Sequence, residues 1–330
     1  MMRSVTWGIL FLLSLIVSTA ASGKELSPRE IYERASPAVV MVLGYADGGR
    51  KGSGGTGSIV QSDGLVLTNA HVVIEEQTGK PFARLSVFLK PARVTGESKS
   101  DLSRMVRAKL LAYSQQLDLA LLKLEGATEA LPVVAVSESG RASIGDRVVA
   151  IGHPEQGGLW TLTTGVISAE VDNFNGVKGK HVFQTETGLN RGNSGGPLLD
   201  GEGRMIGVNT AIARVASDGL PIMSISFSLK SSVATQWLRE QGVGARGTTL
   251  PTGQMQPAID QSIAPLVQPQ AKPAQPPQSD LSLKPMVKPE VVQPAPVRPY
   301  NLDELISDRA KAEVDLDSMM SEMRGRMKGR

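Results

Sequence analysis

The stretch NRGNSGGPLLD, residues 190–200, places Ser194 among three glycines. Glycine costs backbone entropy, so a cluster is retained where the main chain must adopt a shape that side chains forbid. One interpretation is a tight surface turn. The other is a serine nucleophile in a loop whose N–H groups face a substrate. A serine hydroxyl of this kind needs a neighbouring base to take its proton.

Three histidines could supply this base, and all of them precede Ser194: His71, His153 and His181. This order excludes the nucleophile elbow of α/β-hydrolases, which GNSGG also matches, because there the histidine follows the serine. A subtilisin-like order would require His153 or His181 as the base, together with long helices that the sequence pattern lacks. We therefore expect His71, in TNAHVV, to be the base. A buried structural histidine is the alternative.

Asp118 is the best candidate for the carboxylate that orients this histidine. It begins the apolar stretch DLALLKL, where a carboxylate is costly unless it has a partner such as an imidazole N–H. Taken alone, an aspartate before a strand is more often a simple strand-end residue. Asp63 and Asp146 lie in turn-like contexts and Asp101 lies in a charged stretch, so we expect these three to be solvated.

The glycines around Ser194 suit a backbone site for the negative oxygen of a tetrahedral intermediate. Gly192, Asn193 and Ser194 form the candidate oxyanion hole, with the N–H groups of Gly192 and Ser194 as the donor pair. The loss of one such donor costs roughly 10²- to 10³-fold in rate. Gly195 and Gly196 would leave room for substrate against the loop.

Short apolar runs rich in Val, Ile, Leu and Thr fill the chain from Ala38 to Phe227, separated by Gly, Asp, Asn and Pro. Many short strands with frequent turns are typical of an all-β barrel or sandwich. The stretch QSDGL fits a hairpin turn. SPRE, residues 27–30, predicts a helix that begins with a capping box. A second helix is expected over residues 232–241, with Gly242 as its stop.

The N-terminal residues 1–22 resemble a secretory signal, with Arg3, an apolar run from Trp7 to Val17, and small residues after it. An uncleaved membrane anchor is the alternative.

The chain of 330 residues has no cysteine, so an exported fold must rely on its core, which favours a bacterial periplasm or secretion. The net charge is only +3 and basic residues form no blocks, so nothing indicates nucleic acid binding.

The composition changes after the expected β domain, which we assign to residues 23–245. Residues 246–300 hold 12 of the 20 prolines and predict an extended linker rich in Pro and Gln. Residues 301–330 predict one amphipathic helix with apolar residues at a 3,4 spacing. A coiled coil or a helix that docks on a partner or membrane surface, and a solvated, frayed tail, both remain open.

The segments TNAHVV, DLALLK and GNSGGPL resemble the catalytic segments of trypsin-like serine proteases, and more closely those of the HtrA/Deg family. GTGSIVQSDGLVLTNAHVV and QTETGLNRGNSGGPLLDGEGRMIGVNT extend the resemblance over about residues 36–230. It implies two six-stranded β-barrels with the site between them, Ser194 as nucleophile, His71 as base and Asp118 as orienting carboxylate. It also implies homotrimers, cleavage of unfolded or misfolded exported proteins, and no need for a metal or cofactor.

The resemblance also implies a small apolar substrate pocket, because Gly188 stands where trypsins that cut after Arg or Lys hold an acid. The pocket residues that it implies are Gly188, Leu189, Asn190, Thr210, Ala211 and Phe227. No PDZ-like domain fits after the protease segment, so we expect the C-terminal helix to provide recruitment or assembly. The rival interpretation is a catalytically silent chaperone or binding protein on a protease scaffold.

Overall fold

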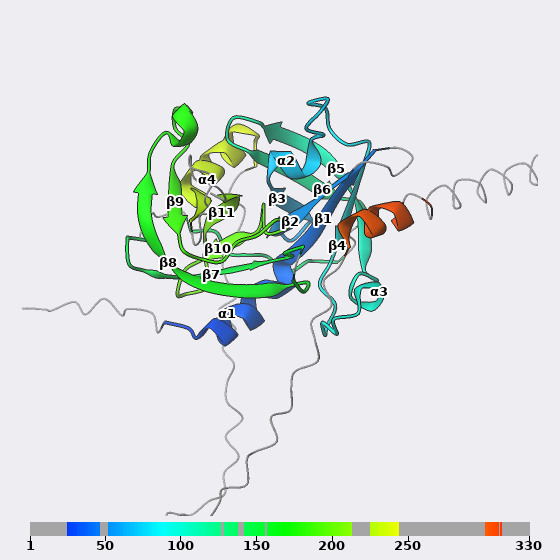
Figure 1. Cartoon of the computed structure of the whole chain (residues 1–330), viewed down its shortest axis with the longest axis horizontal. Helices are drawn as coiled ribbons and strands as arrows, with labels where there is room; N and C mark the ends of the chain where they lie inside the picture. Colours follow the sequence, from blue (N-terminus) through cyan, green and yellow to red (C-terminus); the bar gives the residue numbers. More distant parts are fainter. Residues whose placement is uncertain are drawn as a thin grey trace, which may run out of the picture.

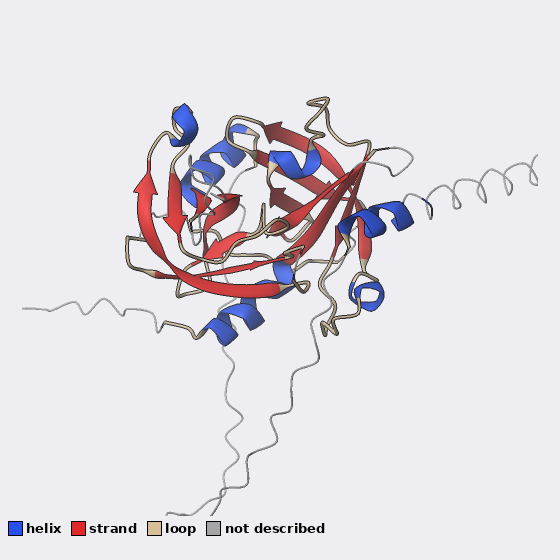
Figure 2. Cartoon of the chain, viewed as in Figure 1, coloured by secondary structure: helices blue, strands red, loops and turns tan. Residues whose placement is uncertain are grey.

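The computed structural model describes residues 25–46, 52–126, 129–137, 142–155, 157–212, 225–243, 301–309 and 311. The expected signal, residues 1–22, and nearly all of the expected linker, residues 246–300, lie outside the described residues. Strands dominate the described part, and Figure 2 shows helices only at its periphery and in the connections. None of its helices is long and apolar enough to cross a membrane.

The first six strands close into an antiparallel barrel in the order β1-β2-β3-β6-β5-β4. Their bounds are β1 Val39–Tyr45, β2 Gly52–Gln61, β3 Leu65–Thr68, β4 Arg84–Phe88, β5 Met105–Ser114 and β6 Leu119–Leu124. The predicted QSDGL hairpin joins β2 to β3, and Gly64 supplies the left-handed residue of the turn, with φ of 92°.

The last six strands close into a second antiparallel barrel in the order β10-β11-β12-β9-β8-β7. Their bounds are β7 Arg147–Gly152, β8 Thr161–Val171, β9 Val182–Thr185, β10 Pro197–Leu199, β11 Met205–Ile212 and β12 Ser226–Lys230. Figure 1 shows this green to yellow barrel beside the blue to cyan first barrel. The two barrels confirm the all-β fold with two six-stranded barrels.

Short helices occupy the ends and connections of the barrels. They are α1 Pro28–Ala35, α2 Ala70–Val73, α3 Ser98–Asp101 and α4 Ser231–Glu240, with 3₁₀ turns η1 Ser36–Ala38 and η2 Phe174–Gly176. The predicted capping box is present at α1, where Ser27 and Glu30 bond reciprocally. Helix α4 agrees with the prediction to within one residue at each end, and Gly242 follows it with φ of 77°.

One continuous apolar core joins the two barrels. Buried residues of β1, β3 and β6 belong to the same cluster as Val149, Leu199 and Val208 of the second barrel. Trp160, which is 2% exposed, donates its Nε1–H to the Val39 carbonyl at 2.7 Å and so links the two barrels. This shared core fixes the relative position of any site that lies between the barrels.

Residues 302–309 form a helix that packs on the first barrel beside β1 and β4, drawn in orange in Figure 1. Ile306 is only 2% exposed, and the Arg309 guanidinium lies 5.3 Å from the centroid of the Phe88 ring on β4. The structure thus shows the predicted helix of residues 301–330 over residues 302–309. Of the residues that follow, only residue 311 belongs to the described part.

The prediction that Asp101 is solvated is wrong. Its side chain is 1% exposed and accepts hydrogen bonds from the N–H and hydroxyl of Thr95 and from the Gly96 N–H. These donors offset the cost of burying the carboxylate and hold the loop between β4 and β5. Asp63 and Asp146 are exposed, as predicted.

Candidate active site

His71 and Asp118 lie together at the junction of the barrels. His71 is in the first turn of α2, directly after β3, and Asp118 directly precedes β6. The His71 Nδ1 atom lies 2.8 Å from Asp118 Oδ2 and 3.0 Å from Oδ1. Because β3 and β6 are paired neighbours in the barrel, the ends of these strands bring the two residues into contact.

The Asp118 backbone is held in an unusual conformation, with φ of 59°. A left-handed conformation is uncommon for a residue other than glycine and is sustained only when its surroundings compensate. The Asn69 side chain donates to the Asp118 carbonyl at 2.7 Å, and the His71 N–H donates to Oδ1 at 3.1 Å. These bonds aim the carboxylate at the imidazole.

Thr210 of the second barrel completes the surroundings of Asp118 by donating its hydroxyl to Oδ2 at 2.6 Å. Burial raises the pKa of the Asp118 carboxyl, but the hydrogen bond and charge of His71, with the donors of Thr210 and the His71 N–H, outweigh it. The net pKa of Asp118 is therefore lowered. The carboxylate stays ionised and orients the histidine with its Nδ1 proton toward Asp118.

Backbone bonds from both barrels fix the nucleophile loop. The Thr56 N–H of β2 donates to the Ser194 carbonyl at 2.8 Å, and the Gly195 N–H donates to the Asn209 carbonyl at 2.8 Å. Gly195 has φ of 84°, and a Cβ there would lie 2.2 Å from the Thr56 carbonyl oxygen. The conformation and the space both require glycine at this position.

The N–H groups of Gly192 and Ser194 donate no hydrogen bond within the described part of the chain. Gly192 has φ of 93°, and its carbonyl accepts the Thr56 hydroxyl at 2.6 Å. The Asn193 N–H instead donates to the Asn190 carbonyl at 3.0 Å, inside the loop's own turn. The N–H of Asn193, which the sequence placed in the candidate oxyanion hole, is therefore engaged within the loop, and Gly192 with Ser194 remain the candidate donor pair.

His153 lies behind this loop and is completely buried. Its Nδ1 lies 3.0 Å from the Thr56 hydroxyl oxygen, which also accepts the His153 N–H. Because the single hydroxyl proton goes to the Gly192 carbonyl, His153 must carry its proton on Nδ1. Burial lowers the pKa of His153 to about 3. This neutral histidine is thus a structural support for Thr56.

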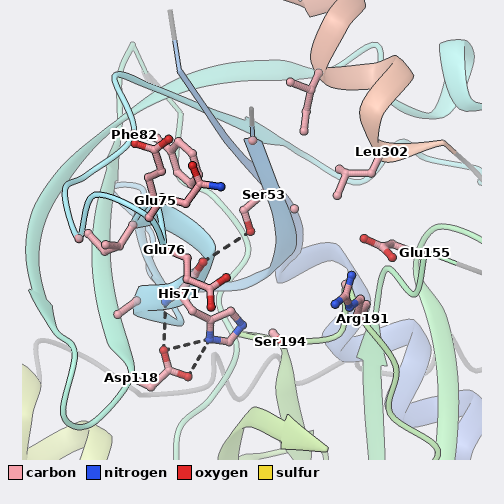
Figure 3. Close-up of a pocket in the computed structure, with 18 of the residues that line it drawn as sticks. Ser53, His71, Glu75, Glu76, Phe82, Asp118, Glu155, Arg191, Ser194 and Leu302 are labelled. Carbon is pink, nitrogen blue, oxygen red and sulfur yellow. Dashed lines mark hydrogen bonds and ion pairs between the residues drawn. The ribbon is translucent and has the colours of Figure 1, made fainter. Parts of the chain in front are cut away.

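Ser194 opens into a cleft of about 960 Å³ that also includes His71 and Asp118. Figure 3 shows Ser194 beside the His71 ring, on the side away from Asp118. The remaining lining comes from Gly52, Ser53 and Gly54 of β2, from Ala70 of α2 and Ile74, Glu75, Glu76, Gln77, Gly79 and Phe82 after it, and from Gln115, Glu155, Arg191, Gly192, Leu302, Asp303 and Ile306.

None of the implied substrate-pocket residues lines this cleft. Gly188 and Asn190 are exposed, and open space surrounds the position of a Cβ at Gly188. Phe227 is half-buried, with its ring centroid 4.6 Å from that of Phe174. Ala211 lies on β11, but its side chain is outside the described part.

Two of the implied pocket residues serve other contacts. Leu189 is 6% exposed and packs in the interior of the second barrel with Val148, Ile167 and Phe183. Thr210 donates its hydroxyl to Asp118. These side chains therefore support the barrel and the carboxylate instead of forming a pocket wall.

Sequence reasoning missed the roles of Thr56, Asn69 and the C-terminal helix. Thr56 lies in the glycine-rich stretch GSGGTGS, and Asn69 lies two residues before His71, so proximity in sequence was the available signal.

The third histidine, His181, contacts Asp172 at 2.5 Å and lines no part of the cleft. Among the described residues, no group of three or more His, Cys, Asp or Glu side chains could hold a metal ion.

This arrangement can activate an alcohol. A carboxylate fixes an imidazole, and the imidazole faces a serine in an open cleft. The backbone N–H groups of that serine and of Gly192 donate to no acceptor among the described residues. This is the set of groups that acyl transfer to serine requires.

Comparison with known proteins agrees with this geometry. Residues 55–208 match the trypsin-like peptidase domain family. A protein named "Probable periplasmic serine endoprotease DegP-like" from Ectopseudomonas mendocina is 34% identical over 225 residues, which are 66% of this chain and 42% of the relative. One of the same name from Chlamydia trachomatis is 39% identical over 181 residues, 54% of this chain and 32% of the relative.

A solved structure described as the HtrA-type protease AlgW with tripeptide superposes with a TM-score of 0.52 at 30% identity. The match covers 66% of this chain and 64% of that chain. The chain thus spans well under half the length of these two curated relatives. The similarity concerns the peptidase domain.

Proposed function

We propose that this chain, which carries a trypsin-like serine peptidase domain of the HtrA/DegP type, is an exported endopeptidase that cleaves unfolded proteins. Ser194 is the nucleophile, His71 the general base and Asp118 the orienting carboxylate. The observation that carries this proposal is the position of His71, which binds Asp118 through Nδ1 and shares one cleft with Ser194.

Acylation begins when Ser194 Oγ attacks the scissile carbonyl carbon and His71 Nε2 takes the hydroxyl proton. The π electrons of the carbonyl move onto its oxygen, and the N–H groups of Gly192 and Ser194 stabilise the resulting charge. The Asp118 carboxylate stabilises the imidazolium that forms, because the lowered pKa of Asp118 keeps this carboxylate ionised.

Collapse of the tetrahedral intermediate breaks the C–N bond. The leaving amine takes the proton from His71 Nε2, and the acyl group remains on Ser194 as an ester. A water molecule then attacks the ester while His71 takes its proton, and a second collapse returns that proton to Ser194 Oγ. The acid product leaves, and neither a metal nor a redox cofactor takes part in these steps.

The names of the relatives support a periplasmic location and a serine endoprotease activity. The apolar run within residues 1–22 agrees with export. Protein quality control, in which damaged exported proteins are degraded, is the role that fits a cleft open to extended chains. Cell fractionation tests the location, because a variant without residues 1–22 should stay in the cytoplasm.

Hydrolysis of a protein in folded and unfolded forms tests the activity. The purified protein should cleave casein and reduced α-lactalbumin but leave native α-lactalbumin intact. Ser194→Ala should abolish cleavage of both unfolded substrates without loss of folding. Turnover that persists in Ser194→Ala, or its absence in the wild type across pH 6 to 9, would refute the proposal. Prevention of aggregation that survives Ser194→Ala without any turnover would identify a silent chaperone.

A further inference from the structure

The C-terminal helix at residues 302–309 docks beside the catalytic cleft through a direct fit to β2. A Cβ on Gly54 would lie 2.5 Å from Leu302 Cδ1, and a Cβ on Gly52 would lie 2.5 Å from Ile306 Cδ1. The two glycines therefore leave the space that these two aliphatic side chains occupy. Any larger residue on that face of β2 would displace the helix.

The spacing on the two elements matches. Residues i and i+2 of a strand share a face and lie about 6.6 Å apart, and residues i and i+4 of a helix lie about 6 Å apart along its axis. Gly52 and Gly54 can therefore receive Ile306 and Leu302 in register. The Asn301 side chain caps the helix by accepting from the N–H groups of Asp303 and Glu304.

This helix supplies part of the wall of the cleft that contains Ser194. Leu302, Asp303 and Ile306 line the same cleft as His71 and Ser194. Figure 3 shows Leu302 projecting from the helix toward the cleft, across from Ser53 and above Glu155. A segment more than 100 residues after the nucleophile thus borders the reaction site.

If the function proposed above holds, the part of the substrate that follows the scissile bond must pass through this cleft. The leaving amine takes its proton from His71 Nε2, so the chain that follows the scissile bond exits past the His71 ring. The cleft extends from Ser194 past His71 to β2 and the loop after α2. Gly188, Asn190 and Phe227, implied for the residue before the bond, do not line it.

Carboxylates outnumber cations among the described residues that line the cleft. Besides Asp118, which binds His71, these residues include four carboxylates and one guanidinium: Glu75, Glu76, Glu155, Asp303 and Arg191. The Asp303 side chain is exposed at the rim, and Leu302 beside it is half-buried. An aliphatic surface next to carboxylates fits the side chain of Lys or Arg, whose stem packs on apolar atoms while its charge reaches the rim.

We propose that the C-terminal helix is a specificity element, in which Leu302 and Asp303 select substrates with Lys or Arg directly after the scissile bond. Leu302 packs against the stem of the basic side chain, and Asp303, with the other rim carboxylates, attracts its charge. A glutamate or aspartate at the same substrate position is repelled. The preference should weaken in high salt, because the rim charges are exposed.

Binding of matched peptides to the Ser194→Ala form of the full chain tests this without turnover. Two fluorescein-labelled octapeptides differ only in carrying Val-Lys-Lys or Val-Glu-Glu at their centre, and fluorescence anisotropy measures their dissociation constants. The lysine peptide should bind tighter, and Asp303→Asn should reduce this ratio about two- to fivefold. Glu304→Gln is the matched control, because Glu304 is also in the first helical turn but does not line the cleft.

Equal affinity for the two peptides, or equal effects of Asp303→Asn and Glu304→Gln, would overturn the proposal. Sequencing of the fragments that the active protein cuts from casein gives an independent readout, and Lys and Arg should be enriched at the position directly after the cut. Loss of that enrichment in Leu302→Ala would support the proposal, and an unchanged pattern would contradict it. Failure of the catalytic proposal is visible separately, as a wild type that does not cleave casein.

Discussion

His153 should make the folded protein sensitive to acid. It is completely buried, and its pKa is lowered by burial from 6.5 to about 3. At a pH between these two pKa values, the imidazole of residue 153 is protonated in the unfolded chain and neutral in the folded protein. The free energy of unfolding must therefore rise with pH in this window and fall as the solution is acidified.

The size of the effect follows from the two pKa values. At a pH below the pKa of the unfolded state, each further drop of one pH unit lowers the free energy of unfolding by about 1.4 kcal/mol, because only the unfolded state gains the proton. Between pH 7 and pH 5, His153 alone should lower the free energy of unfolding by about 2 kcal/mol. The loss should approach about 5 kcal/mol near pH 3, where the folded protein also begins to accept the proton.

Urea unfolding of the wild type and of His153→Gln at pH 7 and pH 5 measures this effect. The substitution lowers stability at both values, but it should remove about 2 kcal/mol of the difference between them. His181→Gln is the control, because the His181 side chain is 40% exposed, and this variant should keep the acid sensitivity due to His153. An unchanged pH dependence in His153→Gln, or an NMR titration of native His153 near pH 6.5, would refute the reasoning.

Three further substitutions test the supports of the site. Gly195→Ala should unfold the protein or abolish labelling of the serine, measured by circular dichroism and active-site titration, because a Cβ there meets the Thr56 carbonyl at 2.2 Å. Thr56→Val should lower kcat by about tenfold or more with little change in KM, since it frees the Gly192 carbonyl. Thr210→Val should cost about 1.5–3 kcal/mol in stability by urea unfolding, because it removes a hydrogen bond to a buried carboxylate. Wild-type values in any of these assays would contradict the stated role.

Local patterns predicted much of the fold. The capping box at residues 27–30, the QSDGL hairpin and Gly242 all act through contacts within a few residues, so the sequence alone reveals them. The contact of His71 with Asp118 could be predicted because each follows or precedes a recognisable apolar strand. The costly position of Asp118 at the head of an apolar run pointed to a side-chain partner for its carboxylate.

Tertiary contacts that leave no local sequence pattern could not be predicted from the sequence. Leu189 looked like a pocket residue, but the second barrel closes around it and buries it. Asp101 looked solvated because it lies in a charged stretch, and no local pattern marked its partners Thr95 and Gly96, although they lie only six and five residues earlier. Strand β5 alternates half-buried and exposed residues and includes two charged residues, Arg107 and Lys109, so it lacked the apolar run that marked its neighbours. The docking of Ile306 on Gly52 depends on packing that no local periodicity encodes.

Labelling of Ser194 with a fluorophosphonate tests most directly whether the three separated segments form one catalytic unit. Phosphonylation requires a serine activated by its histidine, and mass spectrometry locates the modified residue without knowledge of any substrate. We expect stoichiometric modification at Ser194, a rate reduced at least about a hundredfold in His71→Ala, and none in Ser194→Ala. No modification of the folded wild type, or a rate unchanged in His71→Ala, would contradict the catalytic role of this site.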